Sequence, residues 1–96
     1  MIAKPAKTRE VNGTSLQGYV TITLHELMNT LGSPHRDGDK TTAEWAFKVD
    51  NVVLTIYDYK NESVPTEMYR WHIGGFNQKA VAAVAKLLPY HKVEGF

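Results

Sequence analysis

The chain has 96 residues, and 11 Lys and Arg against 10 Asp and Glu give a formal net charge of +1. This balance argues against a protein that mainly neutralises nucleic-acid phosphates, and against an acidic mimic of nucleic acid. Cysteine is absent, which excludes disulfides, zinc–thiolate sites, iron–sulfur clusters and cysteine nucleophiles. The length suits one domain. The missing cysteines suit a reducing cytoplasm, where we expect the protein to act. No apolar run approaches the roughly 20 residues of a membrane span, so we expect no membrane contact.

The N-terminal part predicts a basic arm, a turn and a strand. Residues 1–9 carry Lys and Arg but no acid, and we expect a mobile or edge-lying arm there. The Asn-Gly pair within Val11–Thr14 is typical of a type I′ hairpin turn. Tyr19–Ile22 is rich in β-branched and aromatic residues, so it predicts a strand.

A short amphipathic helix is predicted next. Thr23 and Glu26 have the spacing of a capping box, so the helix should begin just after Thr23. Gly32 and Pro34 should end it. The apolar positions follow the i, i+3, i+4, i+7 spacing of one helical stripe and are Leu24, Leu27, Met28 and Leu31.

Two strands joined by a tight turn are predicted after a polar loop at residues 33–41. Glu44–Val49 alternates between apolar and other side chains, and the apolar run Val52–Tyr59 follows. Asp50 and Asn51 tolerate the positive φ angles of a two-residue turn. This turn produces three cross-strand pairs of core residues: Val49 with Val52, Phe47 with Leu54, and Trp45 with Ile56.

The last part predicts one more strand and one more helix. Met68–Ile73 suits a strand, with Tyr69, Trp71 and Ile73 on one side, and Gly74-Gly75 should break it. Asn77 is a good N-cap for a helix over residues 78–88, whose apolar residues again form one stripe. The tail at residues 90–96 should either pack or fray.

The predicted order is strand, helix, strand, strand, strand, helix. Strands joined by hairpins favour an antiparallel sheet, and two amphipathic helices need a sheet face to bury against. We therefore expect an α+β fold: a two-layer sandwich with about four antiparallel strands and both helices on one face. Residues 10–89 form the single predicted domain, between the arm at 1–9 and the tail at 90–96.

Five short segments together carry a resemblance to a known family. They are Leu16–Tyr19, Leu31–Pro34, Asp39–Trp45, Thr55–Lys60 and Trp71–Gly75. Their order and spacing over residues 16–88 resemble a family of small proteins that are encoded mainly by bacteriophages and other viruses. No activity is established for that family, so the resemblance implies a viral context and no particular chemistry.

The polar loop Asp37–Thr41 invites two functional interpretations, and its residues depart from both. In a phosphate-binding loop the Lys directly follows Gly, but here Asp39 stands between Gly38 and Lys40. An EF-hand calcium loop needs Gly at its sixth position and Glu at its twelfth, where this chain has Thr42 and Lys48. We expect a solvated turn and neither a metal nor a cofactor.

No set of catalytic residues emerges from the sequence. No two histidines have the i, i+4 spacing of a zinc hydrolase helix, and no serine lies in a Gly-x-Ser-x-Gly elbow. His72 is either a general base or a ligand-facing donor beside Gly74-Gly75, or a strand residue that hydrogen-bonds Glu44 or Asp58. Glu44 and Asp58 should lie on opposite sheet faces, so they do not form a catalytic pair. We therefore expect no enzymatic activity.

The outer face of the predicted sheet is the better candidate for function. Tyrosines beside charged residues are favoured at binding surfaces, because the ring buries area while the hydroxyl keeps a polar partner. Two other interpretations stay open: an ordinary solvated face, or the seam of a homo-oligomer. The candidate binding residues are Glu44, Lys48, Thr55, Tyr57, Tyr59, Lys60, Trp71 and His72.

Two functional hypotheses follow. The first is a non-enzymatic phage accessory protein that binds a host protein, for example as an inhibitor of a host enzyme or of an antiviral defence. The second is a module for a small ligand or nucleotide, such as a sponge for a signalling nucleotide, in which Lys40, Lys60, Arg70, Trp71 and His72 recognise phosphate and base. Nucleic acid is not expected as the main partner, because only the basic arm favours it.

Overall fold

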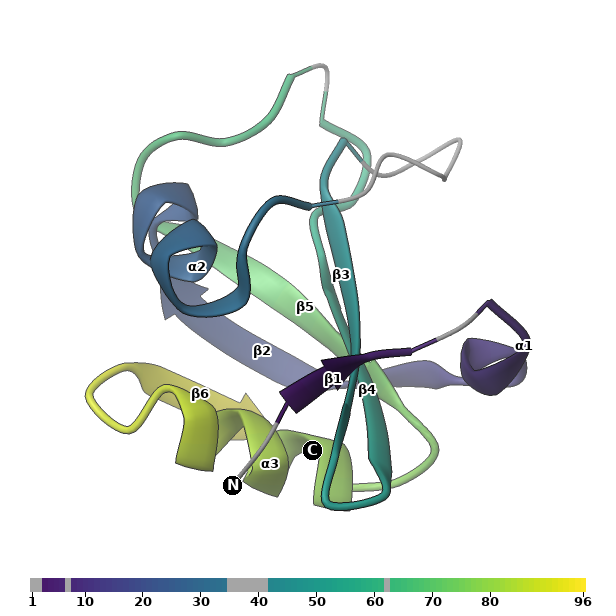
Figure 1. Ribbon diagram of the computed structural model, residues 1–96. Coiled ribbons are helices and arrows are strands. Elements are labelled where there is room, and N and C mark those ends of the chain that lie inside the picture. Colours follow the sequence, from purple (N-terminus) through teal and green to yellow (C-terminus); the bar gives the residue numbers. More distant parts are fainter. Residues whose placement is uncertain (1–2, 7, 35–41, 62) are drawn as a thin grey trace.

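Six strands and three helices make up the part of the chain that the structure describes, namely residues 3–6, 8–34, 42–61 and 63–96. The structure is a computed structural model (Figure 1). None of the helices within these ranges is long and apolar enough to cross a membrane. The elements are β1 (Ala3–Pro5), α1 (Thr8–Val11), β2 (Ser15–Ile22), α2 (Leu24–Leu31), β3 (Glu44–Val49), β4 (Val52–Tyr57), β5 (Tyr69–Gly75), α3 (Lys79–Leu87) and β6 (Lys92–Gly95).

The strands form one antiparallel sheet in the order β1-β3-β4-β5-β2-β6. The predicted α+β class and antiparallel sheet are confirmed, but the sheet has six strands where about four are predicted. The two extra strands lie at its edges. β1 pairs with β3, Ala3 facing Val49, and β6 pairs with β2, Tyr19 facing Glu94. The chain near each end therefore takes part in the sheet.

Three local predictions differ from the structure. The Asn12-Gly13 turn joins α1 to β2 instead of closing a hairpin, and Gly13 has a φ of 86°. β5 continues through Gly75 instead of breaking before it, because Ser15 and Leu16 of β2 pair with this end. The N-cap position of α3 is Gln78, although Asn77 Oδ1 does accept a hydrogen bond from the Lys79 amide at 2.9 Å.

The β3–β4 hairpin has the predicted register. Asp50 and Asn51 have φ angles of 48° and 68°, as a type I′ turn requires at both of its central positions. Because side chains alternate along a strand, this turn determines which residues of both strands are buried. The cross-strand pairs are Val49 with Val52, Phe47 with Leu54 and Trp45 with Ile56.

One face of the sheet is the core face, and α2 and α3 cover it. Figure 1 shows α2 where β2 ends and β5 begins, and α3 lower in the view, beside β6. A side chain at Gly75 would bring its Cβ within 2.4 Å of Ala80 Cβ, so α3 lies directly on the sheet there. The fully buried side chains include Val20, Ile22, Leu27, Trp45, Leu54, Ile56, Trp71 and Ile73.

Two buried tryptophans hold α2 at both of its ends. Trp71 Nε1 donates to the Ile22 carbonyl at 3.0 Å, just before the helix begins, and Trp45 Nε1 donates to the Gly32 carbonyl at 2.9 Å, where it ends. The two rings meet edge to face, with centroids 5.4 Å apart. The predicted cap is also present, because Thr23 Oγ1 accepts from the Glu26 amide at 3.2 Å.

Replacing Trp71 should therefore weaken the whole fold. Trp71→Phe leaves the Ile22 carbonyl without its donor and opens a cavity beside Trp45. We expect the free energy of unfolding to fall by about 2–4 kcal/mol. Urea unfolding followed by far-UV circular dichroism measures this. Tyr90→Phe, at a residue that is 95% exposed, is the control and should change stability by less than about 0.5 kcal/mol. An equal effect of the two substitutions would contradict this role.

Candidate binding surface

The outer face of the sheet carries a row of polar and aromatic side chains that crosses five strands. Strand pairing places Glu44 opposite Tyr57, Tyr57 opposite His72, and His72 opposite Tyr19. Tyr19 in turn faces Glu94 on the edge strand β6. Directly paired residues on one face of antiparallel strands have Cβ atoms about 5 Å apart, so each side chain in the row can contact the next.

His72 and four other rings form what we call the aromatic cluster: Tyr19, Tyr57, Tyr59, His72 and Phe96. The Tyr57 ring stacks on His72 with centroids 5.2 Å apart, and Tyr19 meets His72 edge to face at the same separation. Tyr59 lies 5.8 Å from His72, and Phe96 lies 6.0 Å from Tyr19. The exposed fractions of Tyr59 and Phe96 are 40% and 73%, so a partner can reach the cluster at both of its ends.

Charged side chains border the aromatic cluster. The Arg70 guanidinium lies 3.7 Å from the centroid of the Tyr19 ring, and its Nε donates to Glu94 at 3.1 Å. Lys60 Nζ lies 5.4 Å from the centroid of the Tyr59 ring. Both cations are within the distance at which an aromatic face attracts positive charge. Because these contacts are exposed, each contributes little to stability, and they orient the rim of the surface.

The centre of the cluster is neutral at neutral pH. Burial lowers the pKa of His72 below its usual value of 6.5, which favours the uncharged imidazole. Burial, together with the nearby Glu44 carboxylate, raises the pKa of Tyr57 above 10.0. His72 Nδ1 is buried and makes no hydrogen bond of normal geometry to any residue that the structure describes. The surface therefore presents uncharged rings inside a rim of both charges.

The buried carboxylate of Asp58 fixes the backbone between Tyr57, the last residue of β4, and Tyr59 in the loop that follows. Asp58 is fully buried and accepts from the Thr42 amide at 2.6 Å, the Ala43 amide at 3.0 Å and Asn61 Nδ2 at 3.0 Å. The Thr42 hydroxyl also donates to it. Burial alone would raise the pKa of Asp58, but these hydrogen bonds outweigh it and hold the pKa below 3.8. Tyr57 and Tyr59 flank this anchored residue.

The structure brings together most of the candidate residues but not all of them. Lys48 lies further along β3, where it forms a 3.1 Å ion pair with Glu10 of α1. Thr55 is only 4% exposed, and Trp71 is fully buried on the opposite face. The phosphate-loop and calcium interpretations of Asp37–Thr41 fall outside the described residues. The candidate residues that do border or join the aromatic cluster are Glu44, Tyr57, Tyr59, Lys60 and His72.

Sequence reasoning missed three residues of the surface. Tyr19 could have been predicted, because it precedes the buried Val20 in a strand and neighbouring strand residues point to opposite faces. No sequence pattern indicates Glu94 and Phe96, because their positions depend on the pairing of β6 with β2. No short apolar pattern marks β6 as a strand.

Among the described residues, no group of three or more His, Asp or Glu side chains is placed to hold a metal ion. The Asp58 carboxylate is enclosed by donors from Thr42, Ala43 and Asn61. Comparisons of the chain with protein-family models, with curated proteins and with solved structures find no match. The geometry of the outer face is therefore the main guide to function.

The protonation of His72 should make stability depend on pH. Because its pKa is lower in the folded chain than the 6.5 of the unfolded chain, the unfolded state binds the proton more readily below pH 6.5. The free energy of unfolding should fall as the pH drops from about 6.5 toward the lowered pKa. Urea unfolding across this range tests it. His72→Gln should flatten this slope and the control His25→Gln should keep it; a slope that survives His72→Gln would contradict the assignment.

The Asp58 network should contribute substantially to stability. Asp58→Asn replaces a charged acceptor and turns one oxygen into a donor that faces other donors. We expect a loss of about 1–3 kcal/mol in the free energy of unfolding, measured by urea unfolding. Asp50→Asn, in the exposed β3–β4 turn, is the matched control and should change stability by less than about 0.5 kcal/mol. If Asp58→Asn matched that control, the network would be unimportant.

Proposed function

We propose that the chain is a non-enzymatic protein that binds a partner protein through the aromatic cluster. The observation that supports this most directly is the contact of five rings on a sheet face that α2 and α3 leave uncovered. Tyrosine rings bury large areas with few rotatable bonds, and they are enriched among residues that dominate the free energy of protein binding.

The distribution of charge supports a protein partner over a polyanion. Arg70 and Glu94 form an ion pair at one side of the cluster, while Glu44 lies across the sheet from them. A neutral centre with a rim of both signs favours selective contact, whereas binding to nucleic acid needs a large positive excess. The net charge of +1 provides no such excess.

The resemblance to phage-encoded proteins supports a partner from the host cell. On this proposal the chain acts in the host cytoplasm, where it covers a functional surface of one host protein and thereby inhibits or modulates it. Inhibition of a host enzyme or of an antiviral defence protein needs only binding, and no catalytic group is required for it. The aromatic cluster supplies the contact, and the rim charges select the partner.

A nucleotide ligand is the second candidate, and one contact favours it. Lys60 Nζ lies over the exposed ring of Tyr59, so a base stacked on Tyr59 would have a cation near its phosphate. The remaining support is smaller, because Trp71 is buried and Arg70 is already paired with Glu94. A thermal-shift screen with nucleotides tests it. A nucleotide present at 100 times its Kd should stabilise the chain by about 2.7 kcal/mol.

Substitution of the cluster tyrosines should weaken binding of the partner. The tagged chain, used as bait in bacterial lysate, should retain one host protein, which is then purified for affinity measurement. Tyr59→Ala and Tyr57→Ala should weaken that affinity by about tenfold or more, as expected for central aromatic contacts. Titration calorimetry measures the change. Tyr90→Ala removes an equally large but isolated exposed ring and should leave the affinity within about twofold.

Three results would overturn the proposal. The first is a partner whose affinity is unchanged by both cluster substitutions although circular dichroism shows them folded. The second is a dimer by light scattering that Tyr59→Ala converts to monomer, since the outer face would then be a seam between copies. The third is stabilisation by a nucleotide that Tyr59→Ala or Lys60→Ala abolishes.

A further inference from the structure

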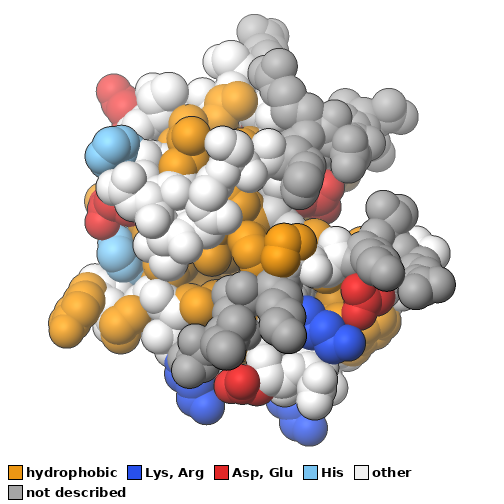
Figure 2. All heavy atoms as spheres, in the orientation of Figure 1, with side chains coloured by type: hydrophobic (Ala, Val, Ile, Leu, Met, Phe, Trp, Pro, Cys, Tyr) orange, Lys and Arg blue, Asp and Glu red, His pale blue; other side chains and the backbone are white. Residues whose placement is uncertain are grey.

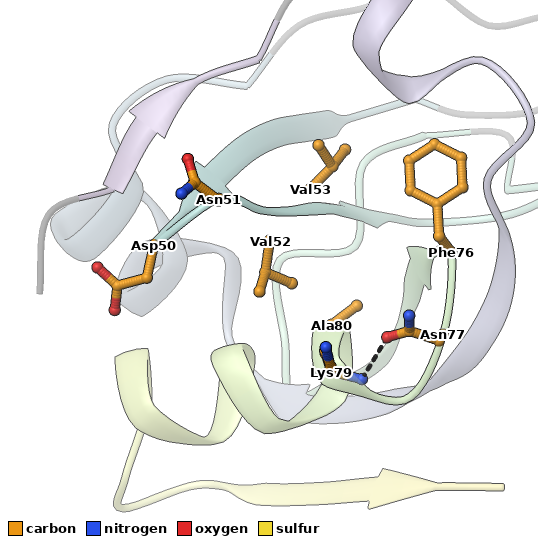
Figure 3. Close-up of a pocket in the computed structure, with 8 residues that line it drawn as sticks. All are labelled: Asp50, Asn51, Val52, Val53, Phe76, Asn77, Lys79 and Ala80. Carbon is orange, nitrogen blue, oxygen red and sulfur yellow. Dashed lines mark hydrogen bonds between the residues drawn. The ribbon is translucent and has the colours of Figure 1, made fainter.

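A second surface lies along α3, on the opposite side of the sheet from the aromatic cluster. Two adjoining hollows, of about 360 and 220 Å³, run between this helix and the β3–β4 turn. Both are lined by Asp50, Val52 and Lys79, so they form one continuous depression that we call the α3 groove. Figure 3 shows Val52 on β4, Asp50 on the turn, and Lys79 and Ala80 at the start of the helix.

The helical wall of the groove has a regular pattern of charge and size. Lys79, Ala82, Ala83 and Lys86 all line the groove, at positions i, i+3, i+4 and i+7 of α3. These positions share one helical stripe, so two lysines stand about 10 Å apart with two methyl groups between them. The alanines leave room for the backbone or side chains of another element, and the lysines border that room at both ends.

The lysines have no ionic partner among the residues that the structure describes. The ion pairs found there involve other side chains, and Asp50 is the one acid that lines the groove. Figure 2 shows basic side chains along the lower edge of the molecule, where α3 lies, with one acidic side chain between them. The floor beneath is apolar, because Val49 and Val52 of the hairpin form it together with Ala83.

We propose that the α3 groove binds an acidic amphipathic helix of a partner protein. Acidic residues spaced i and i+7 on that helix match the spacing of Lys79 and Lys86, because both helices advance by 1.5 Å per residue. Apolar residues at its i+3 and i+4 positions then face Ala82 and Ala83 and fill the floor. A nucleic acid could bind the two lysines through its phosphates, but it has no apolar side chain to pack against Val49 and Val52. The apolar floor therefore favours the helix.

The groove is independent of the aromatic cluster. The cluster lies on the outer face of the sheet, whereas Val52 lies on its core face and Ala80 and Ala83 lie on the side of α3 that packs against the core. A chain with both surfaces can hold two partners at once, or two parts of one partner. Substitutions in the aromatic cluster should therefore leave binding at the α3 groove unchanged, and the reverse. Each proposal can thus fail without the other.

A designed peptide tests the groove without knowledge of the natural partner. The probe is a fluorescein-labelled helical peptide of about 18 residues, with Glu at i and i+7 and Leu at i+3 and i+4. Fluorescence anisotropy should show saturable binding to the full chain with a Kd below about 1 mM. The double variant Lys79→Glu/Lys86→Glu should bind about tenfold more weakly and should instead prefer a peptide with Lys at i and i+7.

Matched controls separate the groove from general attraction. Lys92→Glu changes the same charge on β6 and should alter the Kd by less than about twofold, and Tyr59→Ala should leave it unchanged. A peptide with Gln in place of both Leu residues should lose binding. The proposal is overturned if the wild-type chain binds neither charged peptide, binds both equally, or ignores the Lys79→Glu/Lys86→Glu change. It is also overturned if single-stranded DNA binds at α3 and the acidic peptide does not.

Discussion

The contact between Trp45 and Trp71 is the constraint on which the rest of this structure depends. Each indole fills the core and donates to a carbonyl at one end of α2, so the helix is fastened to the sheet at its beginning and at its end. Because strand side chains alternate, burying Trp45 in β3 and Trp71 in β5 also decides which neighbours point outward. The core contact thereby determines the composition of the opposite face.

The opposite, outer face of the sheet carries the aromatic cluster. With Trp71 inside, the next residue, His72, points outward between Tyr19 and Tyr57. Asp58 then turns inward after β4 and is enclosed by hydrogen bonds, which holds Tyr57 and Tyr59 on either side of a rigid point. A surface built on such fixed strands is largely preformed, so little conformational entropy is lost when a partner binds.

The sequence predicts the local elements better than the distant pairings. The register around Asp50 and the limits of α2 follow from turn and capping residues that act over a few positions. The edge strands β1 and β6 are harder to predict, because they are only three and four residues long and their places depend on pairing with strands distant in the sequence. For the same reason Glu94 and Phe96 were absent from the predicted surface. Trp71 was included although its alternation with His72 placed it on the core face.

We propose the aromatic cluster as the primary binding surface and the α3 groove as a second one. Site-specific photo-cross-linking tests the primary claim most directly. A benzophenone amino acid replaces Tyr59 in one variant and Tyr90 in another, because both rings are exposed but only Tyr59 belongs to the cluster. We expect a covalent adduct with the captured partner protein from position 59 and none from position 90. An adduct from position 90 alone would contradict it.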